Sequence, residues 1–511
     1  MSLIRGFFTV GLWTMASRVL GFLRDIVIAA TLGAGPVAEA FFVAFTLPNM
    51  FRRFFAEGAF NMAFVPMFSK RLETGEDPDG FASDALSAMV GLLVVLVALA
   101  MLAMPWLVLA MASGFAGDER FDLAVIFGRI VFPYILFISL AALLSGVLNA
   151  SGRFVAAAAA PVLLNVLFIG AMGLGAALGW DIGIVLSWTV PLAGIAQMAL
   201  VWVAARRAGF AIRLHWPRLT PELKRLAVIA GPALLAGGVV QINLIVGRQV
   251  ASFTEGAIVW LSFADRLYQL PLGVVGVAVG IVLLPDLSRR LAGGDEAGAR
   301  DAFNRAAEIS LALTLPAAVA LGLIAMPLIS VLFERGAFLH EDSAATALAL
   351  VIYAAGLPAF VFQKVLQPLY FARENTKAPF RFALVALVVN AVIAVGLMPI
   401  IGYLAAALGA TVAGWAMVLL LWRGSRGYGD AAALDSRFID RAWRIAVASL
   451  IMGGVLAAVQ ATLQGWLADP TLRYAALLIL VAAGMATYAI VGQVLRAFSI
   501  AELRSATRRQ R

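Results

Sequence analysis

The chain has 511 residues, of which 63% carry apolar side chains and only 13% are charged. This composition excludes a soluble globular domain and indicates a membrane protein with many spans. The chain contains no cysteine, which excludes disulfides, thiolate nucleophiles and cysteine-ligated metal sites.

Apolar runs of about 18 residues or more predict fourteen membrane-spanning helices. In chain order they cover residues 6–32, 37–67, 82–113, 122–149, 156–178, 183–204, 226–251, 258–286, 306–333, 343–371, 380–400, 403–422, 443–463 and 474–495. Proline, glycine or charge interrupts the first, second, eighth and tenth runs, which is expected of helices that bend around a cavity. The predicted fold is therefore an all-α polytopic membrane protein.

The first two runs carry an unusual amount of charge. Their charged residues are Arg18, Arg24, Asp25, Glu39, Arg52, Arg53 and Glu57. A cation near the bilayer centre costs roughly 2.5–3.5 kcal/mol, so such residues normally face a water-filled cavity, a partner charge or a ligand. Structural ion pairs are the alternative to a ligand site.

Spacing along a helix indicates which of these charges can pair. Sequence neighbours point about 100° apart, so neither Arg24 with Asp25 nor Asp265 with Arg266 is expected to pair within its own helix. Arg53 and Glu57, four residues apart, can pair.

The distribution of Lys and Arg predicts the orientation in the membrane. Loops on the side of the N-terminus hold 27 of the 38 basic residues, whereas the opposite loops hold only Arg120, Arg335 and Arg473. By the positive-inside rule both termini are cytoplasmic. This rule accounts for the net charge of +9 without nucleic-acid binding.

Two sequence matches indicate an internal repeat. FVPMFSKRL at 64–72 returns as LLPDLSRRL at 283–291, and the segment from Pro133 to Asn165 returns between Pro358 and Asn390. Two six-helix lobes followed by two extra helices are typical of transporters with a substrate site between repeats, although short apolar motifs also match by chance. The predicted parts are an N-terminal lobe (1–206), a cytoplasmic interfacial linker (207–225), a C-terminal lobe (226–423), a second cytoplasmic linker (424–442), the last two helices (443–497) and a basic cytoplasmic tail (498–511).

The sequence has no P-loop, dinucleotide-binding glycine turn, HExxH motif or GxSxG context, so we expect a transporter without cofactor or metal and not an enzyme. Inside the predicted spans, eight cations outnumber four carboxylates, and buried arginines suit a phosphate-bearing ligand. The cations are Arg18, Arg24, Arg52, Arg53, Arg129, Arg248, Arg266 and Lys364, and the carboxylates are Asp25, Glu39, Glu57 and Asp265.

Several motifs resemble one known family along essentially the full length. They are SRVLGFLRD at 17–25, AFFVAFTLPNMFRRFFAEGAFNMAFVP at 40–66, FPYIL at 132–136, ADRL at 264–267 and GVVGVAVGIVLLPDLS at 273–288. These segments closely resemble the MurJ (MviN) lipid II flippases of the multidrug/oligosaccharidyl-lipid/polysaccharide (MOP) exporter superfamily. The resemblance implies fourteen helices, two lobes, a central cationic cavity and a lipid-tail groove along the last two helices.

The implied task is to move lipid II, the undecaprenyl-diphosphate-linked peptidoglycan precursor, from the inner to the outer leaflet of the bacterial cytoplasmic membrane. The resemblance implies that the diphosphate is bound by Arg18, Arg24, Arg52 and Arg266, with supporting cavity charges at Asp25, Glu39, Arg53, Glu57 and Asp265. The expected partners are lipid II, membrane lipids and peptidoglycan-synthesis proteins, and the protein is expected to be a monomer.

Some relatives hold sodium with carboxylates of the middle helices. The corresponding spans here offer Gln241, Asn243, Asn390 and Thr411, which are either a candidate ion site or interhelical hydrogen-bonding groups. Without a deep carboxylate, drive by the membrane potential is favoured, at about 2.3 kcal/mol per elementary charge per 100 mV.

Other functions fit the sequence less well. An exporter of another polyprenyl-diphosphate-linked glycan stays open as an alternative, whereas a drug exporter acting on organic cations would need an excess of carboxylates in its cavity. A membrane glycosyltransferase or polymerase would need a large extracytoplasmic loop with a poised carboxylate, and the predicted loops on that side are short.

Overall fold

The computed structural model describes residues 3–52 and 59–498 of the chain. Within these ranges the secondary structure is helical, and the only β-type pairing is an isolated bridge between Arg335 and Phe338. The predicted all-α class is confirmed. In the described part, ten helical segments are long and apolar enough to cross a membrane, so the count of fourteen stays a prediction.

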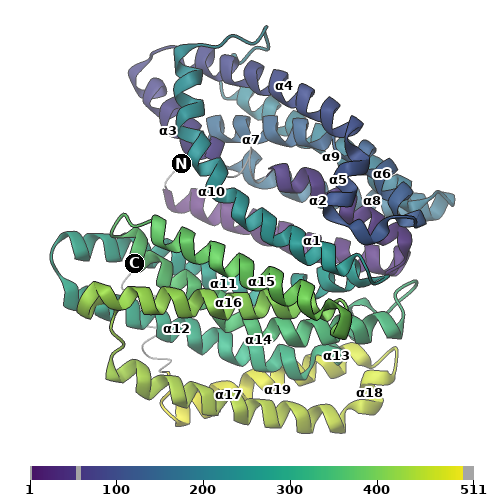
Figure 1. Cartoon of the computed structure of the whole chain (residues 1–511), viewed down its shortest axis with the longest axis vertical. Helices are drawn as coiled ribbons and strands as arrows, with labels where there is room; N and C mark the ends of the chain where they lie inside the picture. The colour runs from purple at the N-terminus through teal and green to yellow at the C-terminus, as the bar shows by residue number, and fades with distance from the viewer. Residues whose placement is uncertain (1–2, 53–58, 499–511) are drawn as a thin grey trace. The chain divides into compact units, whose positions relative to one another are not determined.

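The chain forms two compact units. The first unit contains residues 1–259 and 335–338, and the second contains residues 260–334 and 339–511. The helices of the first unit are α1 (Leu3–Leu32), α2 (Pro36–Arg52), α3 (Ala59–Thr74), α4 (Pro78–Leu102), α5 (Met104–Met111), η2 (Ser113–Phe115), α6 (Glu119–Val131), α7 (Tyr134–Ala150), α8 (Val155–Leu178), α9 (Ile182–Arg207) and α10 (Pro221–Ala251) (Figure 1).

The second unit continues from α11, whose first residues still belong to the first unit. Its helices are α11 (Ala257–Ala292), α12 (Glu296–Leu323), α13 (Ala325–Phe333), α14 (His340–Phe371), α15 (Lys377–Ile401), α16 (Leu404–Ser425), η3 (Arg426–Ala432), α17 (Ser436–Thr462), α18 (Gln464–Ala468) and α19 (Arg473–Val494). Its core packs Leu287 of α11, Phe303 of α12, Val361 of α14 and Leu421 of α16 together.

The boundary between the units falls after α10. The span predicted at 226–251, within α10, was assigned from the repeat to the C-terminal lobe, yet α10 packs with α3, α5 and η2 in the first unit. At its start, Arg71 of α3 forms an ion pair of 3.2 Å with Glu222. The division into two six-helix repeats stays a prediction, because compactness and repeat symmetry are different criteria.

Helix breaks occur where sequence patterns did not predict them. The third, fourth and ninth predicted runs are each divided into two helices, at Ala103, at Phe132–Pro133 and at Ile324. A proline lies at or near the start of each following helix, at Pro105, Pro133 and Pro327, where a missing backbone N–H is tolerated. The first, eighth and tenth runs instead lie in the single helices α1, α11 and α14.

A four-residue segment at 335–338 belongs to the first unit although the residues on both sides belong to the second. The backbone N–H of Ala337 donates to the carbonyl of Ala30 at 2.9 Å. Gly33 and Gly336 have φ of +63° and +59°, and a Cβ on Gly336 would lie 2.1 Å from the Ala30 oxygen. Glycine is therefore required at Gly336 by both its backbone conformation and the close approach of α1.

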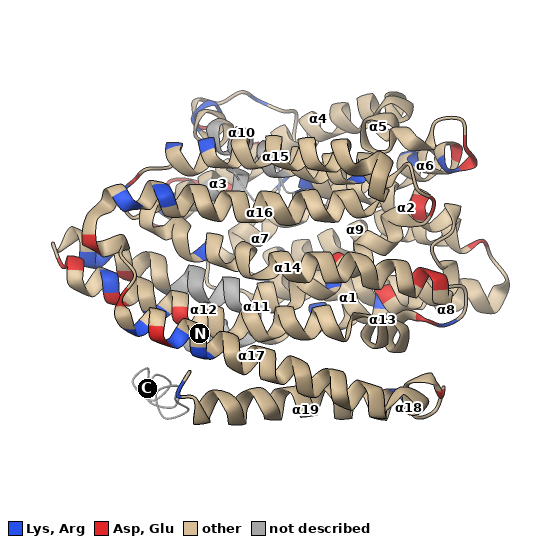
Figure 2. Ribbon diagram, turned by 60° about the horizontal axis from the view of Figure 1, so that its bottom comes forward, with Lys and Arg blue, Asp and Glu red and all other residues tan. Residues whose placement is uncertain are grey.

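Charged residues are found mainly in loops and at helix ends, and long stretches of the helices carry none (Figure 2). This distribution is expected of helices whose middle portions lie in lipid. The charged residues that lie within helices and are buried therefore need a specific explanation.

Candidate functional site

Arg24 on α1 forms an ion pair with its sequence neighbour Asp25. The Arg24 Nη2 and Nε atoms lie 2.7 Å and 3.0 Å from Asp25 Oδ1, and both residues are buried. The expectation that these neighbours cannot pair was wrong. The Cβ directions diverge, but the long arginine side chain turns back far enough to place its guanidinium against the shorter carboxylate.

Asn165 of α8 holds the other edge of the Arg24 guanidinium. Arg24 Nη1 donates to Asn165 Oδ1 at 3.1 Å, while Asn165 Nδ2 donates to the carbonyls of Ser17 at 3.1 Å and Pro161 at 3.3 Å. A Cβ on Gly21 would lie 3.6 Å from the Asn165 amide, so α1 passes close to α8 at this level. Asn165 thus fixes Arg24 and joins two helices.

Phe168 lies one turn further along α8, and the Arg24 guanidinium carbon lies 5.5 Å from the centroid of its ring. A carboxylate, an amide and an aromatic face therefore surround this arginine. In the sequence, Asn165 marked only the end of a repeat. Its contact with Arg24 was not predictable, because it joins positions 141 residues apart.

The other predicted arginines of the first unit lie in different surroundings. Arg18 is exposed and lies six residues before Arg24, which places the two about 120° apart around α1. Arg52 is partly buried in the last turn of α2. Arg53 and Glu57 lie outside the described residues.

Glu39 is enclosed at the start of α2, with 0% of its surface exposed. Its carboxylate accepts a hydrogen bond from Arg120 Nη1 at 2.9 Å and another from the backbone N–H of Ile258 at 3.2 Å. A carboxylate bonded in this way within the first unit stabilises the packing of α2 with α6, and it is not exposed to a ligand in this structure.

Arg120 is a buried partner that sequence reasoning treated as a loop cation. It donates through Nε to Asp118 at 2.6 Å and through Nη1 to the carbonyl of Ser252 at 3.4 Å, and it lies 4.5 Å from the Phe115 ring centroid. Burial raises the pKa of the Asp118 carboxyl, but hydrogen bonds from the backbone and side chain of Arg120 outweigh this effect and hold it below its ordinary value. An arginine next to a predicted span end gives no sequence signal that separates burial from exposure.

The end of α10 is bound to η2 by a set of polar contacts. Gln249 Oε1 accepts hydrogen bonds from the backbone N–H of Ser113 at 2.9 Å and from its hydroxyl at 2.7 Å. The N–H of Gly114 donates to the hydroxyl of Ser252 at 2.9 Å. With the pair of Arg71 and Glu222 at the start of α10, these contacts fasten both ends of that helix within the first unit.

The predicted charges of the second unit lie on α11. Asp265 accepts a hydrogen bond from Gln269, and both Asp265 and Arg266 are partly buried. One turn along, Tyr268 stacks on Tyr353 of α14 with 5.2 Å between ring centroids. Tyr268 lies three residues after Asp265 and two after Arg266, so it is nearer to the face of Asp265 than to that of Arg266.

Two of the four candidate ion-site residues, Asn390 and Thr411, make contacts that join helices. Thr411 donates to the carbonyl of Ile352 at 3.0 Å, linking α16 to α14. Asn390 is buried beside Gly409, where a Cβ would lie 2.6 Å from its Oδ1 atom. On α10, Gln241 is buried and Asn243 is partly buried, and two residues of spacing turn them to different faces. An ion site at these residues stays a prediction.

The described residues contain no group of three or more His, Cys, Asp or Glu side chains arranged to hold a metal ion. His215 lies 3.1 Å from Asp84, and His340 lies 3.2 Å from Glu334, each as an isolated pair.

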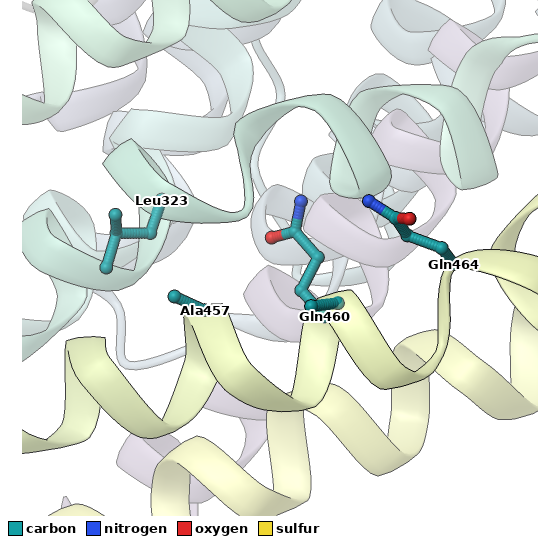
Figure 3. A pocket seen from close by; sticks show the side chains of 5 residues that line it. Leu323, Ala457, Gln460 and Gln464 are labelled. Carbon is teal, nitrogen blue, oxygen red and sulfur yellow. The ribbon is translucent and has the colours of Figure 1, made fainter.

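A small pocket lies in the second unit where α17 meets α18. It has a volume of about 210 Å³ and is lined by Leu323, Ala457, Gln460, Ala461 and Gln464. Figure 3 shows the amide groups of Gln460 and Gln464 on the same side of this chain segment. Pockets that enclose drug-sized ligands are about 300–1,000 Å³, so this one is too small for a large glycolipid headgroup.

Comparisons with known proteins agree along the length of the chain. A family model described as "Lipid II flippase MurJ" matches residues 28–499. A curated relative from Rhizobium tropici, named "Probable lipid II flippase MurJ", is 42% identical over 100% of this chain and 98% of its own length.

Solved structures show the same likeness. A "Lipid II flippase MurJ, inward closed conformation" aligns with a TM-score of 0.79 and 26% identity, covering 95% of this chain and 98% of that chain. An inward-facing multidrug resistance MATE family transporter of the MOP superfamily gives a TM-score of 0.69 at 14% identity, over 81% of this chain and 95% of that one. The second match shows a likeness of fold alone.

Proposed function

Because the chain belongs to the MurJ family of lipid II flippases, we propose that it moves lipid II from the cytoplasmic to the periplasmic leaflet of the inner membrane. The observation that carries this proposal is the family match over residues 28–499 together with 42% identity along the whole chain. As a flippase it is a multi-pass inner-membrane transporter that serves peptidoglycan synthesis, and it is not an enzyme.

The diphosphate of lipid II is the group that the arginines would bind. Arginine presents a planar fork of donors that matches phosphate oxygens, and lysine does not. Arg24 already has its fork aligned by Asp25 and Asn165. A diphosphate carries more negative charge than one carboxylate, so it can compete with Asp25 for the same donors. We assign the same role to Arg18, Arg52 and Arg266.

Asp25 would then act as a placeholder for the substrate. A buried guanidinium without an anion is costly, and Asp25 supplies that anion between transport cycles. We assign supporting roles to Asp265 near Arg266, and to Arg53 and Glu57. Glu39 supports the site at a distance, because its carboxylate is occupied by Arg120.

The orientation proposed for the chain places both termini in the cytoplasm, supported by the excess of basic residues in loops on the N-terminal side. We propose that the protein is a monomer. We also propose that the membrane potential drives transport, because a cationic cavity that binds an anionic headgroup moves charge across the electric field of the membrane. Proteins of peptidoglycan synthesis would supply and consume the substrate on the two sides.

Substitution of the arginines tests the proposal. In Arg24, Arg52 and Arg266, a change to Lys keeps the charge but loses the fork, so complementation of a depletion strain should be partial, whereas a change to Ala should abolish it. Lipid II binding by the purified protein should fall in the same order. Membrane protein levels are measured in parallel.

Structural ion pairs predict another outcome. Loss of Arg24 would then leave Asp25 buried and unpaired, and the protein level would fall together with activity. Variants that are abundant and inactive but still bind lipid II with the affinity of the unaltered protein would refute the diphosphate site.

A further inference from the structure

The segment that joins α9 to α10 is held along α4 by a regular set of contacts. The backbone N–H groups of Ala211, Arg213 and His215 donate to Asp79 Oδ2 at 3.0 Å, Ser83 Oγ at 3.0 Å and Ser87 Oγ at 3.1 Å. Four residues of helix rise about 6 Å and two residues of extended chain rise about 6.6 Å, so the two spacings match. The register is therefore fixed residue by residue.

Two further contacts complete this attachment. His215 Nε2 lies 3.1 Å from Asp84 Oδ1. Pro217 packs over Gly91, where a Cβ would lie 2.9 Å from the proline ring. From Asp79 to Gly91, one face of α4 thus carries short side chains that contact residues 211–217, and this segment is a defined part of the first unit.

The outer side of this segment is apolar and uncovered. Ile212 is 3% exposed, whereas Leu214, Trp216 and Leu219 are 60%, 87% and 82% exposed. Large apolar side chains held in place by rigid backbone contacts, without protein covering them, mark an interaction surface. We call Leu214, Trp216 and Leu219 the linker patch.

Basic residues flank the linker patch in the sequence. Between positions 206 and 225 there are six cations and a single carboxylate, Glu222, which is already paired with Arg71. The cations are Arg206, Arg207, Arg213, Arg218, Lys224 and Arg225. Arg213 and Arg218, the two nearest the patch in sequence, are both exposed. The surface therefore attracts anions next to its apolar groups.

The position of the linker patch identifies its partner. The segment starts where the membrane-length helix α9 ends, at Arg207, and finishes where α10 begins, at Pro221. Tryptophan and leucine beside arginine, at the end of a span, are suited to the boundary between headgroups and acyl chains of an anionic leaflet. We propose that the linker patch binds anionic phospholipid in the leaflet that it faces, with Trp216 inserted between the lipids and Arg213 and Arg218 on their phosphates.

The absence of cysteine makes a direct test practicable. A Trp216→Cys variant of the full-length protein carries a single thiol for an environment-sensitive fluorophore. It is reconstituted into vesicles of phosphatidylcholine alone or mixed with phosphatidylglycerol, and the label is quenched with spin-labelled lipids of either headgroup or with aqueous iodide. A Trp106→Cys variant, at an exposed position on α5, is the matched control.

The label at position 216 should be quenched by lipid and protected from iodide, with stronger quenching by spin-labelled phosphatidylglycerol than by phosphatidylcholine. High salt, or the double change Arg213→Gln and Arg218→Gln, should reduce this headgroup preference to the value measured at position 106. Iodide access at position 216 equal to that of a water-exposed site would overturn the proposal. So would a headgroup preference that persists without both arginines, or protection that arises only when a soluble cell fraction is added.

Discussion

Asn165 offers a test of how Arg24 is positioned, by the substitution Asn165→Ala. The change removes one charge-assisted hydrogen bond to Arg24 and two hydrogen bonds to backbone carbonyls of α1 and α8. A hydrogen bond to a charged group contributes about 1.5–3 kcal/mol. If the oriented guanidinium binds the diphosphate, lipid II affinity should fall on the order of 10- to 100-fold, since about 1.4 kcal/mol corresponds to tenfold.

The assay is lipid II binding to purified protein, arranged as a double-mutant cycle with Arg24→Ala. The effect of Asn165→Ala should disappear when Arg24 is absent, because Asn165 acts through that side chain. Gln197→Ala is the control. Gln197 of α9 donates to the carbonyl of Ala160 in α8, the helix that carries Asn165, at 2.8 Å, and it accepts a hydrogen bond from the Tyr134 hydroxyl at 3.3 Å. An equal loss of affinity with and without Arg24, or an equal loss from Gln197→Ala, would refute the positioning role.

Three further predictions concern stability and orientation. Glu39→Gln leaves Arg120 with Asp118 as its one carboxylate partner among the described residues, so we expect a loss of about 3 kcal/mol in stability, seen as a lower thermal unfolding temperature. An unchanged transition would contradict the buried pair. Gly336→Ala places a side chain on a residue with positive φ and against the backbone of Ala30, so the amount of protein in the membrane should drop. Gly427→Ala, where a Cβ meets no atom within 4 Å, should leave the amount unchanged, and equal amounts of the two variants would count against this constraint. Single cysteines that replace the exposed residues Glu73 and Ala297 should be shielded from an impermeant thiol reagent in intact cells, whereas cysteines that replace Ala116 and Ala468 should react. Labelling of the cysteine at position 297 from outside would contradict the proposed orientation.

The fold class and the family were predictable from the sequence, because both rest on signals spread along the whole chain. Each of the fourteen runs predicted as a single span coincides, within the described residues, with one helix or with two consecutive helices, whereas the count of fourteen spans stays a prediction. The motifs around Arg24, Arg52 and Arg266 predicted the MurJ family, and this is confirmed by the family match. Helix breaks at Ala103 and Ile324 were missed, because a proline early in a helix and a proline inside one have the same appearance in sequence.

The contacts of the candidate site were less predictable. Helical spacing alone excluded the pair of Arg24 and Asp25, because that argument follows Cβ directions and ignores the reach of an arginine side chain. Arg120 was counted with the loop charges, and its pairing with Glu39 across 81 residues depends on tertiary packing that no local pattern encodes. Asn165 was noticed only as a repeat marker for the same reason.

The return of residues 335–338 to the first unit has a consequence for biosynthesis. Gly336 and Ala337 lie against α1, yet the ribosome makes them after the whole of α11, α12 and α13. The first unit therefore cannot reach its final structure as a finished domain when residue 259 emerges, and the usual order of folding one domain before the next is synthesised does not apply. Until residues 335–338 are synthesised, the carbonyl of Ala30 near the end of α1 lacks its hydrogen bond from Ala337. The first unit is therefore completed late in membrane insertion.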